Sequence, residues 1–545
     1  MRRYHLYIIA LLALLPVSSC KKDKFFEITR PQEPQWVSTV TFDQGLASVY
    51  FNILYALQAS PQMMDFAESG ISQLLPGTTT GAPYNEMYNR LFDQNHNLTN
   101  DMWSRCYASI TLCNQALTLD QERNGNAFNL ALTGSDYKDN YTRQIGEYYF
   151  TRAWAYYFLV RYFAPPYIHG GGNNVAYIPY KTKVPQSKEE ILAEKLGTNE
   201  EIYNQMIADL RAAKDKLPLA YNAATMLPTY LVGRANKYAA SALLAKILFL
   251  KGDYDGAKAE ADFVINAAET TGRYALEEPI QAFNKNVLAN IPKEAILEFN
   301  TGDPLVTNAN NYLYWGWVIS LQDRDADNFG RGPAPGMSKS SVSQFTLSYW
   351  VLDTIGWMTD PLHGDYSLTQ AAKDDLRFQQ LYYYLLPYKA NASAAEYFTH
   401  ETLIAHAQVN TPQLYVDKYF RGGPGDGRFT KFPLIRLADL YLSRAWLRWK
   451  AGDLAGAAAD LNKVWNRSNP TNLNRYSSGN VNHDSIFAEY VREMAGEGYT
   501  LDFMVSTQMP IPGGDRIGVS AVNPPYTGWK WTVPAAEKAL NPDYQ

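Results

Sequence analysis

Aromatic rings gather beside hydrogen-bonding side chains in two segments of the sequence, 77–97 and 308–331. The candidate residues are Tyr84, Asn85, Tyr88 and Arg90 in the first segment, and Tyr312, Tyr314, Trp315, Trp317, Asp323 and Arg324 in the second. Flat rings can stack on the apolar face of a sugar, while amide, carboxylate and guanidinium groups bind its hydroxyls. These residues are therefore the predicted ligand-binding residues. On a strand Trp315 and Trp317 would share one face, so core packing is an equally good interpretation of that pair.

No catalytic constellation accompanies these rings. The sequence lacks a G-x-S-x-G elbow, an H-E-x-x-H pair, a P-loop and a G-x-G-x-x-G turn, and its seven histidines have no metal-ligand spacing. Paired carboxylates of a glycosidase stay an open alternative, because only the three-dimensional structure sets their separation. We therefore predict a binding protein without enzymatic activity and without a cofactor.

Asp323, Asp325 and Asp327 begin like a calcium-binding loop. Asn328 stands where the sharp turn of such a loop requires glycine, and Ala334 stands where the bidentate glutamate belongs. A solvated acidic loop is therefore the favoured interpretation, and calcium is the weak alternative.

Cys20 indicates where the protein resides. It follows a positive start, an apolar run over 6–17 and two small residues, Ser18 and Ser19. The run is about half of the ~20 residues that a membrane span needs, so 1–19 are predicted to be a signal peptide. A cysteine at the cleavage site can carry lipid, and several acyl chains hold a protein firmly on a membrane. We predict a bacterial lipoprotein attached to the membrane through this lipid alone.

Composition agrees with an exported, folded body of 545 residues, of which 46% are hydrophobic. The net charge of −5 gives no general attraction to nucleic acid, which we exclude as a partner. Cys106 and Cys113 lie seven positions apart on one predicted helix, which is too far for a disulfide. The aromatic content of 14% exceeds what a core requires and favours stacked ligands.

A motif occurs twice, 200 residues apart. Gly252-Asp253 and Gly452-Asp453 each follow a long predicted helix and are each followed by small residues at identical spacing. The glycine can take the left-handed position that ends one helix, and the aspartate can cap the next. Each copy therefore predicts a tetratricopeptide-like pair of antiparallel helices.

Helical patterns predominate over roughly 40–270 and 430–500, and 270–430 is rich in loop-forming residues. The stretch 146–163 is almost entirely aromatic and aliphatic, and Pro165-Pro166 ends it. The predicted fold is mainly α, a helical scaffold with a long loop-rich insertion.

Motifs over nearly the whole chain match one known family. They are the lipobox at Cys20; Trp103, Tyr107, Ile110, Cys113, Asn114 and Leu117; Gly146, Glu147, Arg152, Ala153, Tyr157, 159–163 and Pro166; 233–235; Glu294, Ile296 and Glu298; 435–442; and Pro534, Glu537, Asn541, Pro542 and Gln545. In order and spacing the chain resembles the SusD/RagB family of outer-membrane nutrient-binding lipoproteins of the Bacteroidetes. It departs at 499–504, where the arginines usual in the family are absent.

The resemblance implies one SusD-like domain over 20–545, with an N-terminal helical part over 21–232 and a SusD/RagB part over 233–545. It also implies an outer-membrane lipoprotein that faces the exterior and passes oligosaccharides to a SusC-like TonB-dependent barrel. Peptide binding by the same architecture, or a scaffold role in the transporter, stay open. Glu489, Arg492 and Glu493 are predicted to form a structural ion-pair network.

Replacing Cys20 by alanine is expected to release the protein from membranes or to leave its signal peptide uncleaved, because the lipid would have no attachment point. Membrane fractionation and the mass of the mature chain measure this. A Cys20→Ala protein that loses its signal and still fractionates with the outer membrane would contradict the anchor.

Overall fold

The chain is described from a computed structural model. It describes residues 36, 38–58, 74–76, 86–92, 97–125, 137–224, 226, 230–284, 293–300, 345–387, 403–407, 411–416, 418, 431–516 and 518–544. Cys20 lies outside these residues.

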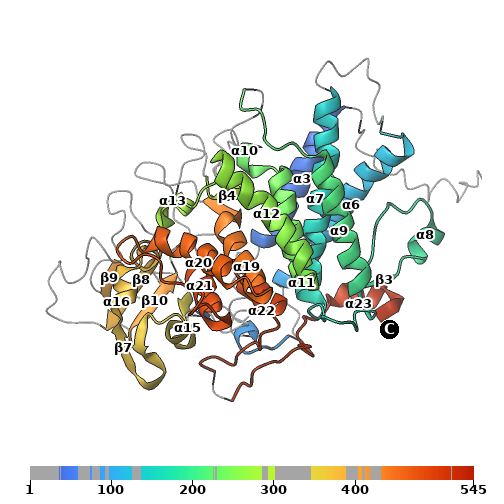
Figure 1. Cartoon of the computed structure of the whole chain (residues 1–545). Coiled ribbons are helices and arrows are strands. Elements are labelled where there is room, and N and C mark those ends of the chain that lie inside the picture. The colour runs from blue at the N-terminus through green and yellow to red at the C-terminus, as the bar shows by residue number, and fades with distance from the viewer. Residues whose placement is uncertain are drawn as a thin grey trace, which may run out of the picture.

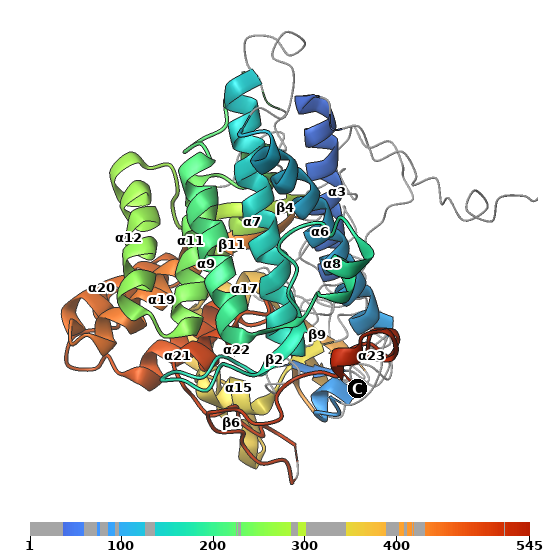
Figure 2. The same ribbon diagram turned by 90° about the vertical axis from the view of Figure 1, so that its right-hand side faces the viewer.

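Long helices packed side by side form the body of the molecule (Figures 1 and 2). They are α3 (Thr39–Gln58), α6 (Asn97–Glu122), α7 (Tyr137–Phe163), α9 (Asn199–Lys216), α11 (Lys237–Lys251), α12 (Tyr254–Thr271), α19 (Leu437–Lys450), α20 (Leu454–Ser468) and α21 (His483–Met494). Each packs on the next in this order, except that α21 packs against both α19 and α20. The short helices α8 (Lys188–Leu192), α10 (Tyr230–Gly233), α22 (Thr500–Ser506) and α23 (Ala535–Leu540) lie around them. The mainly α scaffold is confirmed.

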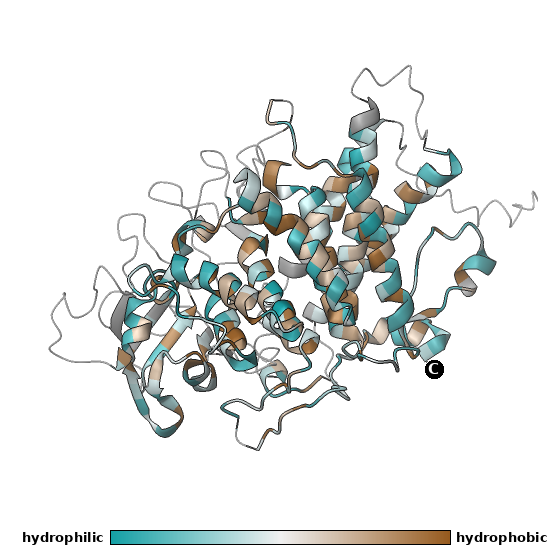
Figure 3. Cartoon of the chain, viewed as in Figure 1, coloured by the Kyte–Doolittle hydropathy of each residue, from teal (hydrophilic) through white to brown (hydrophobic). Residues whose placement is uncertain are grey.

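Helix α7 lies between α6 and α9, and its C-terminal half is largely aromatic and aliphatic and buried on nearly every side. Nearly all side chains from Phe150 to Phe163 are buried, including Trp154 and Tyr157. A helix that is hydrophobic all round must be covered on all sides, which explains its central place. Figure 3 shows polar residues concentrated on the outer faces of the surrounding helices.

The two predicted helical pairs are α11–α12 and α19–α20. Gly252 and Gly452 end the first helix of each pair in the left-handed region, with φ of 84° and 85°. Asp253 and Asp453 cap the second helix, each accepting from the N–H three residues on, at 3.0 and 2.8 Å. Both features of the repeated motif are therefore confirmed.

The described part of 270–430 is more regular than the loop-rich segment predicted for it. A five-stranded sheet has the order β1 (Leu74–Pro76), β5 (Phe345–Leu347), β10 (Gln413–Val416), β8 (Tyr382–Pro387), β9 (Leu403–Ala407). Only β8 and β9 run parallel. The other elements here are α13 (Pro279–Asn284), α15 (Tyr349–Thr354), β6 (Met358–Asp360), η4 (Pro361–His363), β7 (Asp365–Leu368), α16 (Gln370–Asp374) and α17 (Leu376–Leu381). The strands of the five-stranded sheet are three to six residues long, and most of them pair with strands that are distant in the sequence. Local periodicity could therefore not reveal this sheet.

Strands β4 (Ala295–Asn300) and β11 (Lys431–Arg436) pair antiparallel, and β11 continues directly into α19. The chain leaves the helical body after β4 and returns through β11. This two-stranded ladder therefore joins the two ends of the intervening segment, 301–430, to the helical frame.

Buried charges hold this junction. Arg436 of β11 binds Glu294, Glu493 and Glu497, the last two at 2.9 and 2.7 Å. Arg377 of α17 binds Glu489 of α21 at 2.8 Å. The whole set consists of Arg377, Lys418, Arg436, Arg467 and Arg492 with Asp375, Glu294, Glu489, Glu493 and Glu497. We call this set the buried ion network; its formal charges cancel. The structural role predicted for Glu489, Arg492 and Glu493 is confirmed.

Asp502 explains the packing at 499–504, where the chain departs from the family pattern. Its carboxylate accepts from Arg161 of α7 at 2.9 Å and from the Tyr157 hydroxyl. Burial of α22 is thus coupled to an ion pair with α7.

Replacing Gly452 by valine is expected to destabilise the fold by at least ~1 kcal/mol, because a β-branched residue fits a positive φ poorly. Gly252→Val is expected to cost more, since a Cβ there would also lie 3.1 Å from the His169 ring, whereas nothing lies within 4 Å at Gly452. Urea unfolding measures both. The asparagine variants, which tolerate left-handed backbone, are the matched controls. Unchanged unfolding midpoints for both valine variants would contradict the helix-ending role.

Glu489→Gln is expected to lower stability by roughly 3 kcal/mol at pH 7, because it leaves buried cations under-compensated. Burial by itself raises the pKa of Glu489, but the charges of Arg377 and Arg492 outweigh burial and hold it below its usual value. A carboxylate with a lowered folded pKa stabilises above its unfolded pKa of ~4.3, and the stabilisation is lost as pH falls through the folded value.

The difference in unfolding free energy between the wild type and Glu489→Gln should therefore become smaller as pH falls below about 4. Urea midpoints measured from pH 7 to pH 3 test this. Asp484→Asn, at an exposed position on the same helix, is the control and should leave the midpoints nearly unchanged. A gap that stays constant down to pH 3 would show that the Glu489 charge contributes nothing.

Candidate functional site

Two of the predicted ligand-binding residues, Tyr88 and Arg90, lie in the described part of the chain. Tyr84, Asn85, Tyr312, Tyr314, Trp315, Trp317, Asp323 and Arg324 lie outside it, as do the calcium candidates Asp325 and Asp327. The structure therefore tests the placement of the first segment only.

Residues 86–92 form one helical turn that ends at Arg90. The Arg90 N–H donates to the Met87 carbonyl at 2.9 Å, and the Leu91 N–H donates to the Glu86 carbonyl at 2.8 Å. Arg90 has a φ of 60°, an uncommon conformation for a residue with a side chain. The turn directs Tyr88 and Arg90 toward the C-terminal segment.

The Arg90 guanidinium is held by that segment. It donates to the carbonyl oxygens of Ser520, at 2.9 Å, and Pro512, and it lies 5.1 Å from the centre of the Trp529 ring. Burial, together with the like charge of Arg516, lowers the pKa of Arg90 to about 9. Arg90 therefore serves mainly to join residues 86–92 to 511–531.

Arg516 lies 5.1 Å from the centre of the Tyr88 ring and donates to the Tyr88 carbonyl. It also donates to the carbonyl oxygens of Gly513 and Pro512, at 2.7 and 3.1 Å. These bonds fix the guanidinium plane beside the ring. Burial lowers the pKa of Arg516 to about 10, within a range where the group stays charged at neutral pH.

Asp515 connects this pair to two more tyrosines. Its carboxylate accepts from the backbone N–H groups of Tyr349 and Trp350, each at 2.7 Å. The Tyr349 ring lies 4.8 Å from that of Tyr366. Burial, followed by the charge of Asp515, raises the pKa of Tyr88 to about 12, so its hydroxyl stays neutral.

We call Tyr88, Tyr349, Tyr366, Asp515 and Arg516 the aromatic seam. The three rings and Asp515 are half-buried, and the residues come from four stretches of the chain. Partly exposed rings beside fixed charged groups can stack on and hydrogen-bond a hydroxyl-rich ligand. Within the described residues no group of acidic, histidine or cysteine side chains could hold a metal ion.

Sequence reasoning missed Tyr349, Tyr366, Asp515 and Arg516. Arg516 is 428 positions from Tyr88, and no local pattern sets either of them apart. The ring-rich stretch at Trp529 and Trp531 was the available signal for an aromatic C-terminal segment. Trp531 anchors that segment, since its N–H donates to the Tyr162 carbonyl at 2.7 Å.

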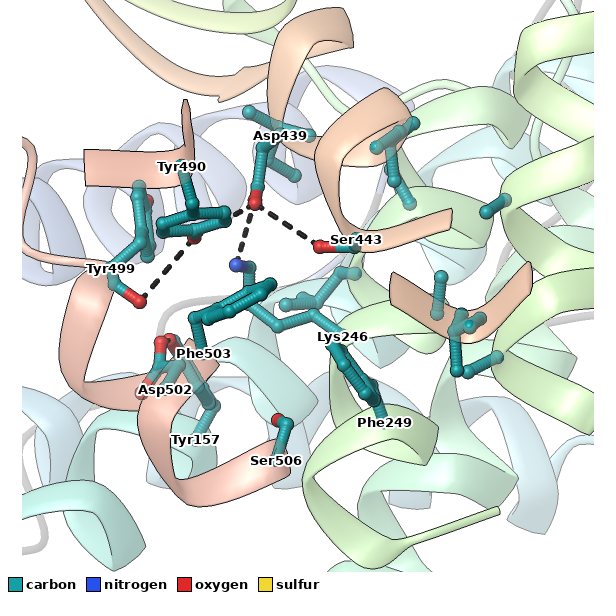
Figure 4. A pocket seen from close by; sticks show the side chains of 18 of the residues that line it. Tyr157, Lys246, Phe249, Asp439, Ser443, Tyr490, Tyr499, Asp502, Phe503 and Ser506 are labelled. Carbon is teal, nitrogen blue, oxygen red and sulfur yellow. Dashed lines mark hydrogen bonds and ion pairs between the residues drawn. The ribbon is translucent and has the colours of Figure 1, made fainter. Parts of the chain in front are cut away.

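An enclosed cavity between α11, α19 and α22 is too small to be the ligand site (Figure 4). Its volume is about 30 Å³, enough for a water molecule. The Lys246 ammonium and the Tyr490 hydroxyl both donate to Asp439, at 2.7 and 2.9 Å, on its wall. These polar groups satisfy one another within the core.

The fold defines a mainly helical protein with tetratricopeptide-like helix pairs. A family model described as starch-binding and associating with the outer membrane matches residues 24–249, and the SusD family model matches residues 369–502. The chain belongs to the SusD family. Among the described helices, none is both long and apolar enough to cross a bilayer.

Relatives and solved structures agree with this assignment. SusD-like protein P2 of Formosa agariphila is 29% identical over 261 residues, which are 48% of this chain and 45% of that protein. The match thus spans less than half of the relative's length. A SusD superfamily protein from Bacteroides vulgatus has a TM-score of 0.66 at 19% identity, with 94% of this chain and 100% of that chain covered. A laminarin-binding SusD-like protein has a TM-score of 0.59 at 19% identity, covering 89% and 95%. These two structures share the fold of this chain.

Proposed function

We propose that this protein is a cell-surface lipoprotein that binds oligosaccharides without changing them chemically and delivers them to a SusC-like TonB-dependent barrel in the outer membrane. Lipid on Cys20 would be its only membrane anchor. The observation that carries the proposal is the aromatic seam, where half-buried rings lie beside a fixed carboxylate and guanidinium.

The geometry of the seam favours sugars as ligands. Tyr88 and Tyr366 offer ring faces, which suit the apolar face of a pyranose. The Asp515 carboxylate is held by two backbone N–H groups and keeps further lone pairs, which are already oriented for hydroxyls. The laminarin-binding structure of the same fold supports a glycan as the ligand class.

Delivery to a barrel is supported by the family and by the predicted anchor. The matched family model is described as associating with the outer membrane. A protein held there by lipid can receive a glycan outside the cell, and a separate transporter would complete uptake.

Tyr88→Ala is expected to weaken binding of an oligosaccharide by about tenfold, because it removes a stacking face. A glycan array with the purified protein would select the oligosaccharide, and isothermal titration would measure its affinity. Tyr88→Phe is the matched control, since it keeps the ring and should keep most of the affinity. Phe51→Ala removes an exposed ring on α3 and should have no effect.

Circular dichroism would establish that each variant is folded. Equal affinity of wild type and Tyr88→Ala would move the site away from the seam. A blank glycan array together with measurable binding of peptides would favour the peptide alternative and contradict glycan capture.

Affinity purification from native outer membranes is expected to recover a TonB-dependent barrel together with this protein. The measurement is mass spectrometry of the complex in mild detergent. Cys20→Ala is the control, because release from the membrane should reduce recovery of the barrel. Isolation of a lone monomer from intact membranes would contradict the delivery role.

A further inference from the structure

A loop between β2 (Ala176–Pro179) and β3 (Leu196–Thr198) encloses a second pocket. The two strands pair antiparallel, and the Tyr180 N–H extends the ladder by donating to the Lys195 carbonyl at 3.0 Å. We call residues 180–196 the clasp loop. In Figure 1 it stands off the helical body and carries α8.

The pocket between the clasp loop and the first turn of α9 has a volume of about 400 Å³. Small-molecule sites typically measure ~300–1,000 Å³, so this pocket has the size of a ligand site. Its walls include Tyr180, three lysines and three glutamates, and it shares no lining residue with the aromatic seam.

The inner wall is fixed to the core. The Lys181 carbonyl accepts from the Asn114 amide and the Tyr156 hydroxyl, at 3.0 and 2.9 Å. The Thr182 carbonyl accepts from Arg152 at 3.1 Å. Because Asn114, Tyr156 and Arg152 are buried on α6 and α7, this wall is preorganised.

The position of the Tyr180 ring in the inner wall depends on a close approach between Tyr180 and Gly197. A Cβ on Gly197 would lie 2.7 Å from the Cβ of Tyr180, so only glycine lets the two strands place that ring as they do. The Tyr180 hydroxyl donates to Gln205 at 2.9 Å, which orients the ring. One half-buried ring face is thus part of a rigid wall.

The outer wall is held by surface ion pairs. Lys181 binds Glu194 at 2.6 Å, and Lys183 binds Glu190 at 2.9 Å. The second pair is largely exposed and the first is half-buried, and ion pairs this accessible to water contribute little, about 0–1 kcal/mol each, and are screened by salt. The outer wall should therefore yield more easily than the inner one.

The charges in the pocket select against an ionic ligand. Lysines and glutamates on the walls balance, and two of the lysines are already paired with carboxylates. Glu201 is committed to the cap of α9 through Thr198. An ionic ligand at Lys181, Lys183 or Glu201 would have to displace one of these partners.

A hydroxyl group fits without displacing anything. A paired ammonium keeps further N–H donors and a paired carboxylate keeps further lone pairs, so one hydroxyl can accept from the first and donate to the second. We propose that the clasp-loop pocket is a binding site for a neutral, hydroxyl-rich ligand of one sugar ring, with Tyr180 against its apolar face. This site is separate from the aromatic seam.

Saturation-transfer NMR with the full chain in detergent micelles tests the proposal. The probes are glucose, galactose, mannose and xylose, with glucuronate and glucosamine as charged comparators. Ala193→Trp and Thr182→Trp each place a large side chain in the pocket from an exposed position. Lys188→Trp adds the same ring on α8 at an exposed position that does not line the pocket, and is the matched control.

At least one neutral sugar should bind the wild type and the Lys188→Trp variant alike. Affinity should fall at least tenfold in both pocket-filling variants, and it should weaken between 0.05 and 0.5 M NaCl. Binding that survives in both pocket-filling variants would overturn the proposal. So would binding of the charged comparators alone, or no binding of any probe to the folded wild type.

Loss of neutral-sugar binding in Tyr88→Ala would place that sugar at the seam and also overturn the second site. Oligosaccharide binding that depends on Tyr88 while the pocket-filling variants change nothing would leave the seam intact and remove only this pocket. The two proposals therefore fail by different results.

Discussion

Exact compensation of buried charge is the constraint on which the C-terminal half of this protein depends. The buried ion network joins α17, β4, β11, α20 and α21, and its formal charges cancel. An uncompensated ion in such a place costs several kcal/mol, so each element can dock only where its charges meet their partners. Arg436 is the central member, because it stands where β11 ends and α19 begins and binds Glu294, just before β4, together with Glu493 and Glu497. This arrangement fixes where the two ends of the segment 301–430 attach to the helical body.

Buried ion pairs also connect the helices of the N-terminal half, but fewer residues take part. Arg152 of α7 binds Asp209 of α9 and the Asn114 amide of α6, and Arg234 binds Glu147. All of these residues except Asp209 belong to the motifs that carry the family resemblance, and all are buried. Their role in this structure is to fix helix positions, not to touch a ligand. These family motifs therefore identify residues that stabilise the helical frame, and they do not indicate which residues bind a ligand.

Both candidate sites use that frame in the same way. The seam forms because residues 511–531 return across the molecule, where Arg90 and Trp531 tie them to the N-terminal helices. The clasp-loop pocket forms because Arg152 and Tyr156 hold one side of an exposed loop. In each case buried, satisfied polar groups place a ring and its polar neighbours before any ligand arrives, which reduces the entropy lost on binding.

The sequence by itself determined the helical scaffold, the two helix-ending glycines with their capping aspartates, and the central apolar helix, because these depend on local spacing and backbone conformation. It also predicted that Tyr88 and Arg90 lie in a ligand-binding segment. Only the tertiary structure showed that Arg90 joins two segments, that Arg516 lies against Tyr88, and that Asp515 links this pair to Tyr349 and, through it, to Tyr366. Those partners come from short segments that lie hundreds of positions from Tyr88 in the sequence. They are brought near it by the packing of distant strands and of the C-terminal segment. No periodicity in one stretch of chain records such packing, since it is decided by burial and charge pairing between elements.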